Sequence, residues 1–125
     1  MNQVLAIAAG GAVGSVLRFW LTKAVHTMTG YAFPYGTLAV NVLGCLAMGW
    51  LFVTFVERGL SDGPWRAGLL VGVLGGFTTF SAFSMETVRL IEQGTAFQAV
   101  VNIAASVTLC LAATWAGMLL ARGLG

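Results

Sequence analysis

The sequence has few charged residues. Asp, Glu, Lys and Arg make up 8% of its 125 residues, whereas 58% are hydrophobic. Soluble domains carry roughly 25% charged residues, so water is not the main solvent of this chain. Charge-free apolar runs recur at or above the roughly 20 residues that a helix needs to cross a hydrocarbon core. We therefore expect an all-α integral membrane protein in contact with the lipid bilayer.

Runs of basic residues and clusters of metal ligands are also missing. The formal net charge is only +2, and Lys and Arg are scattered along the chain, which excludes a nucleic-acid partner. The two cysteines, Cys45 and Cys110, lie in apolar runs without the spacing of a zinc site. They are typical of small buried side chains and not of a disulfide or a metal site.

Four membrane spans follow from the apolar runs, within one domain that covers residues 1–125. Polar or Gly/Pro-marked connections, "HTMTGYAFPYG", "ERGLSDGP" and "EQGT", separate the spans. The first run resembles the apolar part of a signal peptide, but no basic residue precedes it, so we expect it to be retained. The predicted spans cover residues 4–24, 33–56, 65–91 and 96–121.

The positive charges give a weak orientation signal. An even number of spans places both termini on one side with Arg58, Arg66 and Arg122, against Lys23 and Arg89 on the other side. Because Lys and Arg in short loops set orientation, this near balance predicts a chain that inserts both ways and forms an antiparallel, dual-topology homodimer. A fixed orientation set by the first span explains the same charges equally well.

Small residues at four-residue spacing predict close helix contacts. Gly10 and Gly14 lie in the first span, and Gly68, Gly72 and Gly76 lie in the third. Such spacing lets helix backbones approach in a membrane, where lipid gives no hydrophobic drive to associate. Packing alone accounts for these glycines.

Polar side chains form stripes on two predicted helices. The fourth-span stripe is about 18 Å long at roughly 1.5 Å per residue. Such a stripe suits either the wall of an ion pathway or hydrogen bonds between helices, and the residues alone leave both open. The members are Thr37, Asn41 and Cys45 in the second span, and Asn102, Ser106, Cys110 and Thr114 in the fourth.

Ionisable residues inside the spans are few. Arg18 lies toward one end of the first span, and we expect it to snorkel to the interface or to pair, with Glu86 as a candidate partner. Glu86 is the one titratable carboxylate expected deep in a span, too little for a proton relay. His26 is expected to be a solvated loop residue.

The segment "GGFTTFSAFSME" (75–86) interrupts the third span. Two glycines followed by Thr78 and Thr79 are poor helix formers, so we expect a break there. Freed backbone groups survive in a membrane only when they are buried in protein or line a cavity or ion site. Free carbonyls suit a small cation. Phenylalanine edges and hydroxyls suit a small anion, and Phe80 and Phe83 share a helix face with Ser81 and Ser84 beside them.

Three segments, "GGAVGSVLR", "GTLAVNVLG" and "GGFTTFSAFSME", together resemble the signature segments of the Fluc/CrcB fluoride channel family. They occur in the family's order, and the length and four-span layout agree over the whole chain. The resemblance implies a channel and not an enzyme. It would be a dual-topology homodimer in a bacterial inner membrane that passes fluoride passively down its electrochemical gradient and relieves fluoride toxicity.

The resemblance also implies residue roles. Phe80 and Phe83 match the phenylalanines whose ring edges contact fluoride, and Asn41 matches the pore asparagine. Gly75 and Thr78 match the positions whose carbonyls hold a structural sodium ion at the dimer interface. Further positions of the expected fluoride pathway are Thr37, Ser81, Asn102, Ser106, Cys110 and Thr114, although Cys110 replaces the usual hydroxyl with a weaker donor. Arg18 matches a first-span arginine with a structural or electrostatic role, in which we also place Glu86.

Two other classes of protein have the same size. A four-helix, proton-coupled exporter of cations or drugs needs a membrane carboxylate that exchanges protons and substrate, and the first span has an arginine instead. A structural membrane subunit would explain the glycines. It would not explain two polar stripes and an interrupted span.

Overall fold

The computed structural model describes residues 2–59 and 63–123, which form helices joined by short connections. Two π-helical segments, η1 (Phe52–Glu57) and η2 (Gly68–Val73), extend or join α-helices. The α-helices are α1 (Asn2–Thr29), α2 (Tyr35–Leu51), α3 (Pro64–Ala67), α4 (Leu74–Phe77), α5 (Phe80–Glu92) and α6 (Ala96–Gly123).

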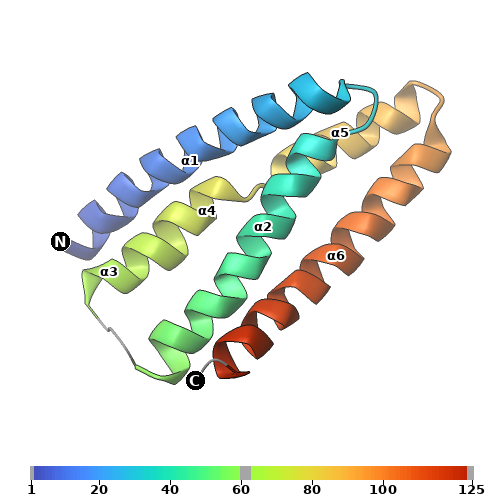
Figure 1. Cartoon of the computed structure of the whole chain (residues 1–125). Coiled ribbons are helices and arrows are strands. Elements are labelled where there is room, and N and C mark those ends of the chain that lie inside the picture. Colours follow the sequence, from blue (N-terminus) through green and yellow to red (C-terminus); the bar gives the residue numbers. More distant parts are fainter. Residues whose placement is uncertain (1, 60–62, 124–125) are drawn as a thin grey trace.

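These elements make four stretches that are long and apolar enough to cross a membrane. They alternate in direction, and both termini lie at the same end of the molecule (Figure 1). The predicted all-α membrane fold with four long apolar helices is confirmed. Residues 60–62 of the second predicted connection lie outside the described residues. The stretches are Asn2–Thr29, Tyr35–Glu57, Pro64–Glu92 and Ala96–Gly123.

The prediction for His26 was wrong. His26 lies inside α1, and its side chain is buried at 8% exposure. The ring stacks on Tyr31 with centroids 4.6 Å apart, and Nδ1 lies 2.8 Å from the carbonyl oxygen of Gly30. Gly30 adopts the left-handed conformation (φ 81°) that commonly follows the end of a helix. The first helix therefore runs about one turn past the expected boundary, and Gly30 and Tyr31, which follow it, contact the histidine.

The predicted glycine contacts join α1 to the third stretch. A side chain at Gly10 would collide with the carbonyl oxygen of Gly68, and one at Gly14 with that of Val73. At Gly72 it would lie 2.8 Å from the carbonyl oxygen of Ile7. Glycine is thus required where the two backbones touch. These backbone contacts at glycines set the distance between α1 and the third stretch, as small residues do in membrane helix pairs.

Helices α2 and α6 run side by side in the same direction (Figure 1). A side chain at Gly49 would collide with the carbonyl oxygen of Thr114, 65 positions later in the chain. The same separation of 65 residues recurs at the Glu57–Arg122 ion pair, whose closest N···O distance is 2.7 Å. Equal separations at both levels mean that residues 65 apart face each other along this seam.

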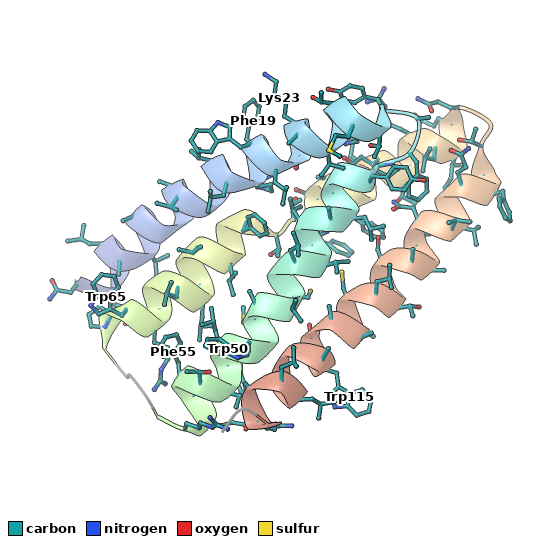
Figure 2. The ribbon with its side chains drawn as sticks, in the orientation of Figure 1. Phe19, Lys23, Trp50, Phe55, Trp65 and Trp115 are labelled. Atoms are coloured by element: carbon teal, nitrogen blue, oxygen red, sulfur yellow. The ribbon has the colours of Figure 1, made fainter. Side chains whose placement is uncertain are left out.

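The outer surfaces are strongly apolar. Figure 2 shows Phe19 and Lys23 projecting from the outer side of α1, and Trp115 from the outer side of α6. Phe19 is 63% exposed and Trp115 65% exposed, whereas the fully buried core is small, with Val40 and Val53 at 1% or less. Exposed apolar area on this scale requires an apolar surrounding, which lipid or another protein surface supplies.

Candidate functional site

The third stretch changes conformation at Thr78 and Thr79. Helix α4 ends at Phe77, and α5 begins at Phe80. Thr78 (φ −88°, ψ 159°) and Thr79 (φ −153°, ψ 121°) between them are extended. An extended pair inside an apolar stretch breaks the regular hydrogen-bond ladder, so its amides and carbonyls need other partners.

Asn41 of α2 supplies two of those partners. Its Oδ1 accepts a hydrogen bond from the Thr79 amide at 2.8 Å, and its Nδ2 donates to the Thr79 carbonyl at 3.0 Å. One side-chain amide thus pairs with both backbone groups of one residue. The hydrogen-bonding groups of an asparagine in an apolar helix and those of the irregular backbone in the neighbouring stretch thus satisfy each other.

The interruption takes the usual helical donors away from carbonyls in the last turn of α4 and just after it, and two of these losses can be followed from the new partners of the amides. In a continuous helix the Thr79 amide would bond to the Gly75 carbonyl, but it donates to Asn41. The Ala82 amide would bond to the Thr78 carbonyl, but it donates to Thr79 Oγ1 at 3.2 Å, where Thr79 caps α5. Gly75 and Thr78 are therefore the residues whose carbonyl oxygens lose these helical donors.

Arg18 satisfies a third carbonyl at this point. Its Nε donates to the Gly76 carbonyl at 2.9 Å, which places a positive charge beside the C-terminal end of α4. The suggested pairing of Arg18 with Glu86 was wrong. A carbonyl freed at the end of α4 lies within reach of Arg18, whereas the Glu86 carboxylate turns toward α2.

Glu86 is bound by a threonine of the second stretch. Thr37 is buried, and its Oγ1 donates to Glu86 Oε2 at 2.8 Å. Glu86 Oε1 is buried and has no hydrogen-bond partner among the described residues. Thr37 and Glu86 thus form a polar contact between α2 and α5, separate from the pocket beside the interruption.

A pocket of about 410 Å³ lies beside the interruption and is lined by most of the key predicted residues. The centroids of the Phe80 and Phe83 rings lie 5.4 Å apart, with an angle of 44° between the ring planes, and Phe80 is 77% exposed. Donors, aromatic edges and the two carbonyl positions thus share one space between α2, α6 and the interrupted stretch. The predicted residues that line it are Asn41, Gly75, Thr78, Phe80, Phe83, Ser106 and Cys110.

Other predicted pathway residues lie outside this pocket. Asn102 is buried and donates through Nδ2 to Thr87 Oγ1 at 2.9 Å, which joins α6 to α5. Thr114 donates to the carbonyl of Cys110 in its own helix. Ser81 lies 3.3 Å from Thr79 Oγ1. The fourth-span stripe therefore divides, with helix pairing at Asn102 and pocket lining at Ser106 and Cys110.

Sequence reasoning missed two residues that hold the site together. The backbone of Thr79 forms both hydrogen bonds with Asn41, and its side chain caps α5 by accepting from the Ala82 amide. Threonine is one of the preferred residues just before a helix, so the cap could have been predicted. Thr87 accepts from Asn102 and donates to the Phe83 carbonyl at 2.7 Å. A lone threonine in an apolar helix gives no comparable signal, because such residues commonly bond to their own backbone.

The family model described as "CrcB-like protein, Camphor Resistance (CrcB)" matches residues 5–118, nearly the whole chain. The chain belongs to the CrcB-like family. The resemblance inferred from the three signature segments is thereby confirmed. The matched region contains the whole interrupted stretch and every residue that lines the pocket.

Similar proteins cover the chain almost completely. A protein of Geobacter sulfurreducens named "Fluoride-specific ion channel FluC" is 50% identical over 124 residues, which span 99% of this chain and 100% of that protein. Proteins of the same name from Caulobacter vibrioides and Methylococcus capsulatus are 50% and 47% identical. They are covered over 97% and 54% of their lengths, respectively. This chain thus matches the Geobacter sulfurreducens and Caulobacter vibrioides proteins over all or nearly all of their lengths.

Proposed function

We propose that this protein is a fluoride-specific ion channel that lets fluoride leave the cytoplasm passively and electrogenically, which lowers its toxicity. The observation that carries the proposal is the pocket where Asn41, Phe80, Phe83 and Ser106 meet beside the interrupted stretch. The names of the full-length relatives support the same function. The family is one of ion channels, which are not enzymes.

The pocket offers fluoride donors in place of water. Asn41 Nδ2 carries two hydrogens and spends one on Thr79, so a second remains for an anion. On the facing helix, the Ser106 hydroxyl donates only a long bond of 3.5 Å to Asn102 Oδ1, which an anion could replace, and the thiol of Cys110 adds a further donor. Ring edges of Phe80 and Phe83 carry positive quadrupole character, so they attract an anion weakly. Weak contacts at several sites allow an ion to enter and also to leave, as conduction requires.

The working unit in this proposal is an antiparallel, dual-topology homodimer in a bacterial inner membrane. The apolar outer surfaces, with residues such as Phe19 and Trp115, offer area for a second copy as well as for lipid. The near balance of positive charge at the two ends supports insertion in both directions. The interruption between α4 and α5 would then lie where two copies meet, and each copy would contribute to the fluoride pathways.

The carbonyls at the interruption fit a structural sodium ion. Gly75 and Thr78 are two of the residues whose helical donors bond elsewhere, to Asn41 and to Thr79 respectively, whereas the Gly76 carbonyl is taken by Arg18. Neutral carbonyl oxygens are hard ligands that suit a small cation. In the dimer, each copy would supply these two carbonyls to an ion at the dimer interface. The sodium would supply fixed positive charge there and would not be transported.

Fluoride efflux from liposomes that contain only the purified protein tests the function. We expect fluoride efflux that carries current, continues without a proton gradient and is not accompanied by chloride efflux. A requirement for a proton gradient would instead indicate a coupled exporter. Absence of any fluoride movement from correctly assembled protein would refute the channel.

A further inference from the structure

We propose that Cys45 and Cys110 form a two-thiol site for a soft metal ion of linear coordination, represented by mercury(II), in the wall of the pocket. The sequence alone predicted neither a disulfide nor a metal site at these residues, because their spacing along the chain is not that of metal ligands. The consequence for fluoride flux rests on the function proposed above. Metal binding itself does not depend on that function.

The helix register brings the two cysteines together. They are separated by 65 positions, like Gly49 and Thr114 or Glu57 and Arg122, so they face each other across the parallel α2–α6 seam. They lie one turn above the level where the backbones touch at Gly49. Both thiols are free, both line the 410 Å³ pocket, and their side chains are close enough to interact.

The donor set selects the kind of metal. Among residues 2–59 and 63–123, no group of three or more His, Cys, Asp or Glu side chains lies together as a metal site. Zinc usually needs four such ligands, so two thiols hold it poorly. Thiolates favour soft metals, and a metal that prefers two opposite sulfur ligands needs no others.

Charge balance selects a dication. Each thiol loses its proton to water and forms one sulfur–mercury bond, while the two ligands that the mercury carried, chloride or water, leave. Two S–H bonds break, two S–Hg bonds replace the bonds to the leaving ligands, and no electron is transferred. The product has two thiolates and one dication and is neutral. A neutral product avoids the cost of leaving net charge in an apolar span. Oxidation of the pair to a disulfide would require an oxidant and is a different reaction.

A bound metal would occupy the fluoride pathway. Cys45 and Cys110 lie one turn from the Asn41–Ser106 level, and all four side chains line the same pocket. Bridging the thiols removes the Cys110 S–H donor and places a metal between the two walls. We therefore expect mercury(II) to block fluoride flux in the wild-type protein.

Metal retention by the purified full-length protein tests the site. The protein is treated with mercury(II) chloride, washed with excess 2-mercaptoethanol and analysed for mercury per chain. Two thiols held by one protein rebind a metal at high effective concentration. We therefore expect the wild type to retain at least roughly ten times as much mercury as Cys45→Ser or Cys110→Ser. Met48→Leu removes a sulfur that lines the pocket but no thiol, so it should retain mercury like the wild type. Zinc(II) should wash off all four proteins.

Equal retention by the wild type and either serine variant would overturn the site, as would two mercury ions per wild-type chain. Flux is then measured for each variant relative to its own untreated rate. If mercury blocks fluoride flux only in the wild type and Met48→Leu, the result supports the position of the two-thiol site in the fluoride pathway. If the wild type retains mercury but its fluoride flux is not blocked, that position is refuted. Protein that retains the metal but never conducts fluoride would count against the proposed function and not against the site.

Discussion

Asn41 and Thr79 are joined by two hydrogen bonds, from the Thr79 amide to Asn41 Oδ1 at 2.8 Å and from Asn41 Nδ2 to the Thr79 carbonyl at 3.0 Å. The pair links α2 to the point where the third stretch leaves the helical conformation. An asparagine that could serve an anion is thus also the residue that makes the irregular backbone tolerable in a membrane. In the proposed channel, conduction and folding would therefore depend on the same side chain.

Replacing Asn41 with Ala should reduce both stability and flux. The Thr79 amide and carbonyl would lose their partners, at a cost of about 1–3 kcal/mol for each group that finds no other. Thermal unfolding in detergent should show a clearly lower midpoint than the wild type. Ser81→Ala is the matched control for stability, since Ser81 is exposed and its hydroxyl hydrogen-bonds only to Thr79 Oγ1 among the described residues. Equal midpoints for Asn41→Ala and the wild type would contradict a structural role for the amide.

Replacing Phe80 with Ile should reduce fluoride flux while the protein still assembles. Because Phe80 is 77% exposed, its ring contributes little to the core of the chain. An aromatic contact contributes about 0.5–1.5 kcal/mol, so we expect flux to fall several-fold, up to roughly tenfold. Phe97→Ile is the control, because Phe97 is 79% exposed and lies outside the pocket. A similar fall in both variants would assign Phe80 to packing against lipid or protein.

Replacing Gly14 with Ala should destabilise the α1 seam strongly. The added methyl group would collide with the Val73 carbonyl and lie 2.9 Å from the Phe77 amide nitrogen. Overpacking of this kind costs about 1–3 kcal/mol, and rigid backbone on both sides leaves little room for relief. Gly11→Ala is the matched control, since the nearest atom to its methyl group would be the Gly72 carbonyl oxygen at 4.0 Å. Because alanine has a higher helix propensity than glycine, Gly11→Ala should keep or raise the unfolding midpoint. Midpoints that fall equally in both variants would contradict the close backbone contact at Gly14 as the cause.

Removal of sodium should weaken the proposed dimer. Replacing sodium with N-methylglucammonium, which is too large for a site of carbonyl oxygens, should shift purified protein toward monomer on size-exclusion chromatography. Restoring sodium should restore the dimer, whereas adding the same concentration of N-methylglucammonium chloride should not. A dimer that is indifferent to this exchange would refute a sodium ion held by Gly75 and Thr78.

The sequence predicted the features that depend on local composition and spacing. Apolar runs indicated the four long helices, and the spacing of Gly10 and Gly14 indicated the seam on which α1 packs. Polar stripes on two helices indicated walls that the structure brings to one pocket at Asn41 and Ser106. These signals survive because a membrane imposes simple rules on length, polarity and small residues.

Pairings between distant residues were harder to predict. Arg18 was matched with Glu86 by opposite charge, but a carbonyl freed at Gly76 was the nearer partner. Charge is visible in a sequence, whereas a carbonyl that has lost its donor is visible only once the backbone is known. His26 was assigned to a loop that begins with it, yet it lies within α1 and stacks on Tyr31, a contact that the sequence does not reveal. The register of α2 and α6 likewise emerges only when both helices are placed.

The backbone contact of α2 and α6 at Gly49 has a consequence for how this family can change over time. Because Gly49 and the Thr114 carbonyl set the helix spacing, the side chains one turn away at Cys45 and Cys110 do not have to. Substitutions at these wall positions can then alter the donors offered to an ion without moving the frame that carries them. An exchange between a hydroxyl and a thiol at Cys110 would be a substitution of this kind, because the two groups differ more in donor strength than in size.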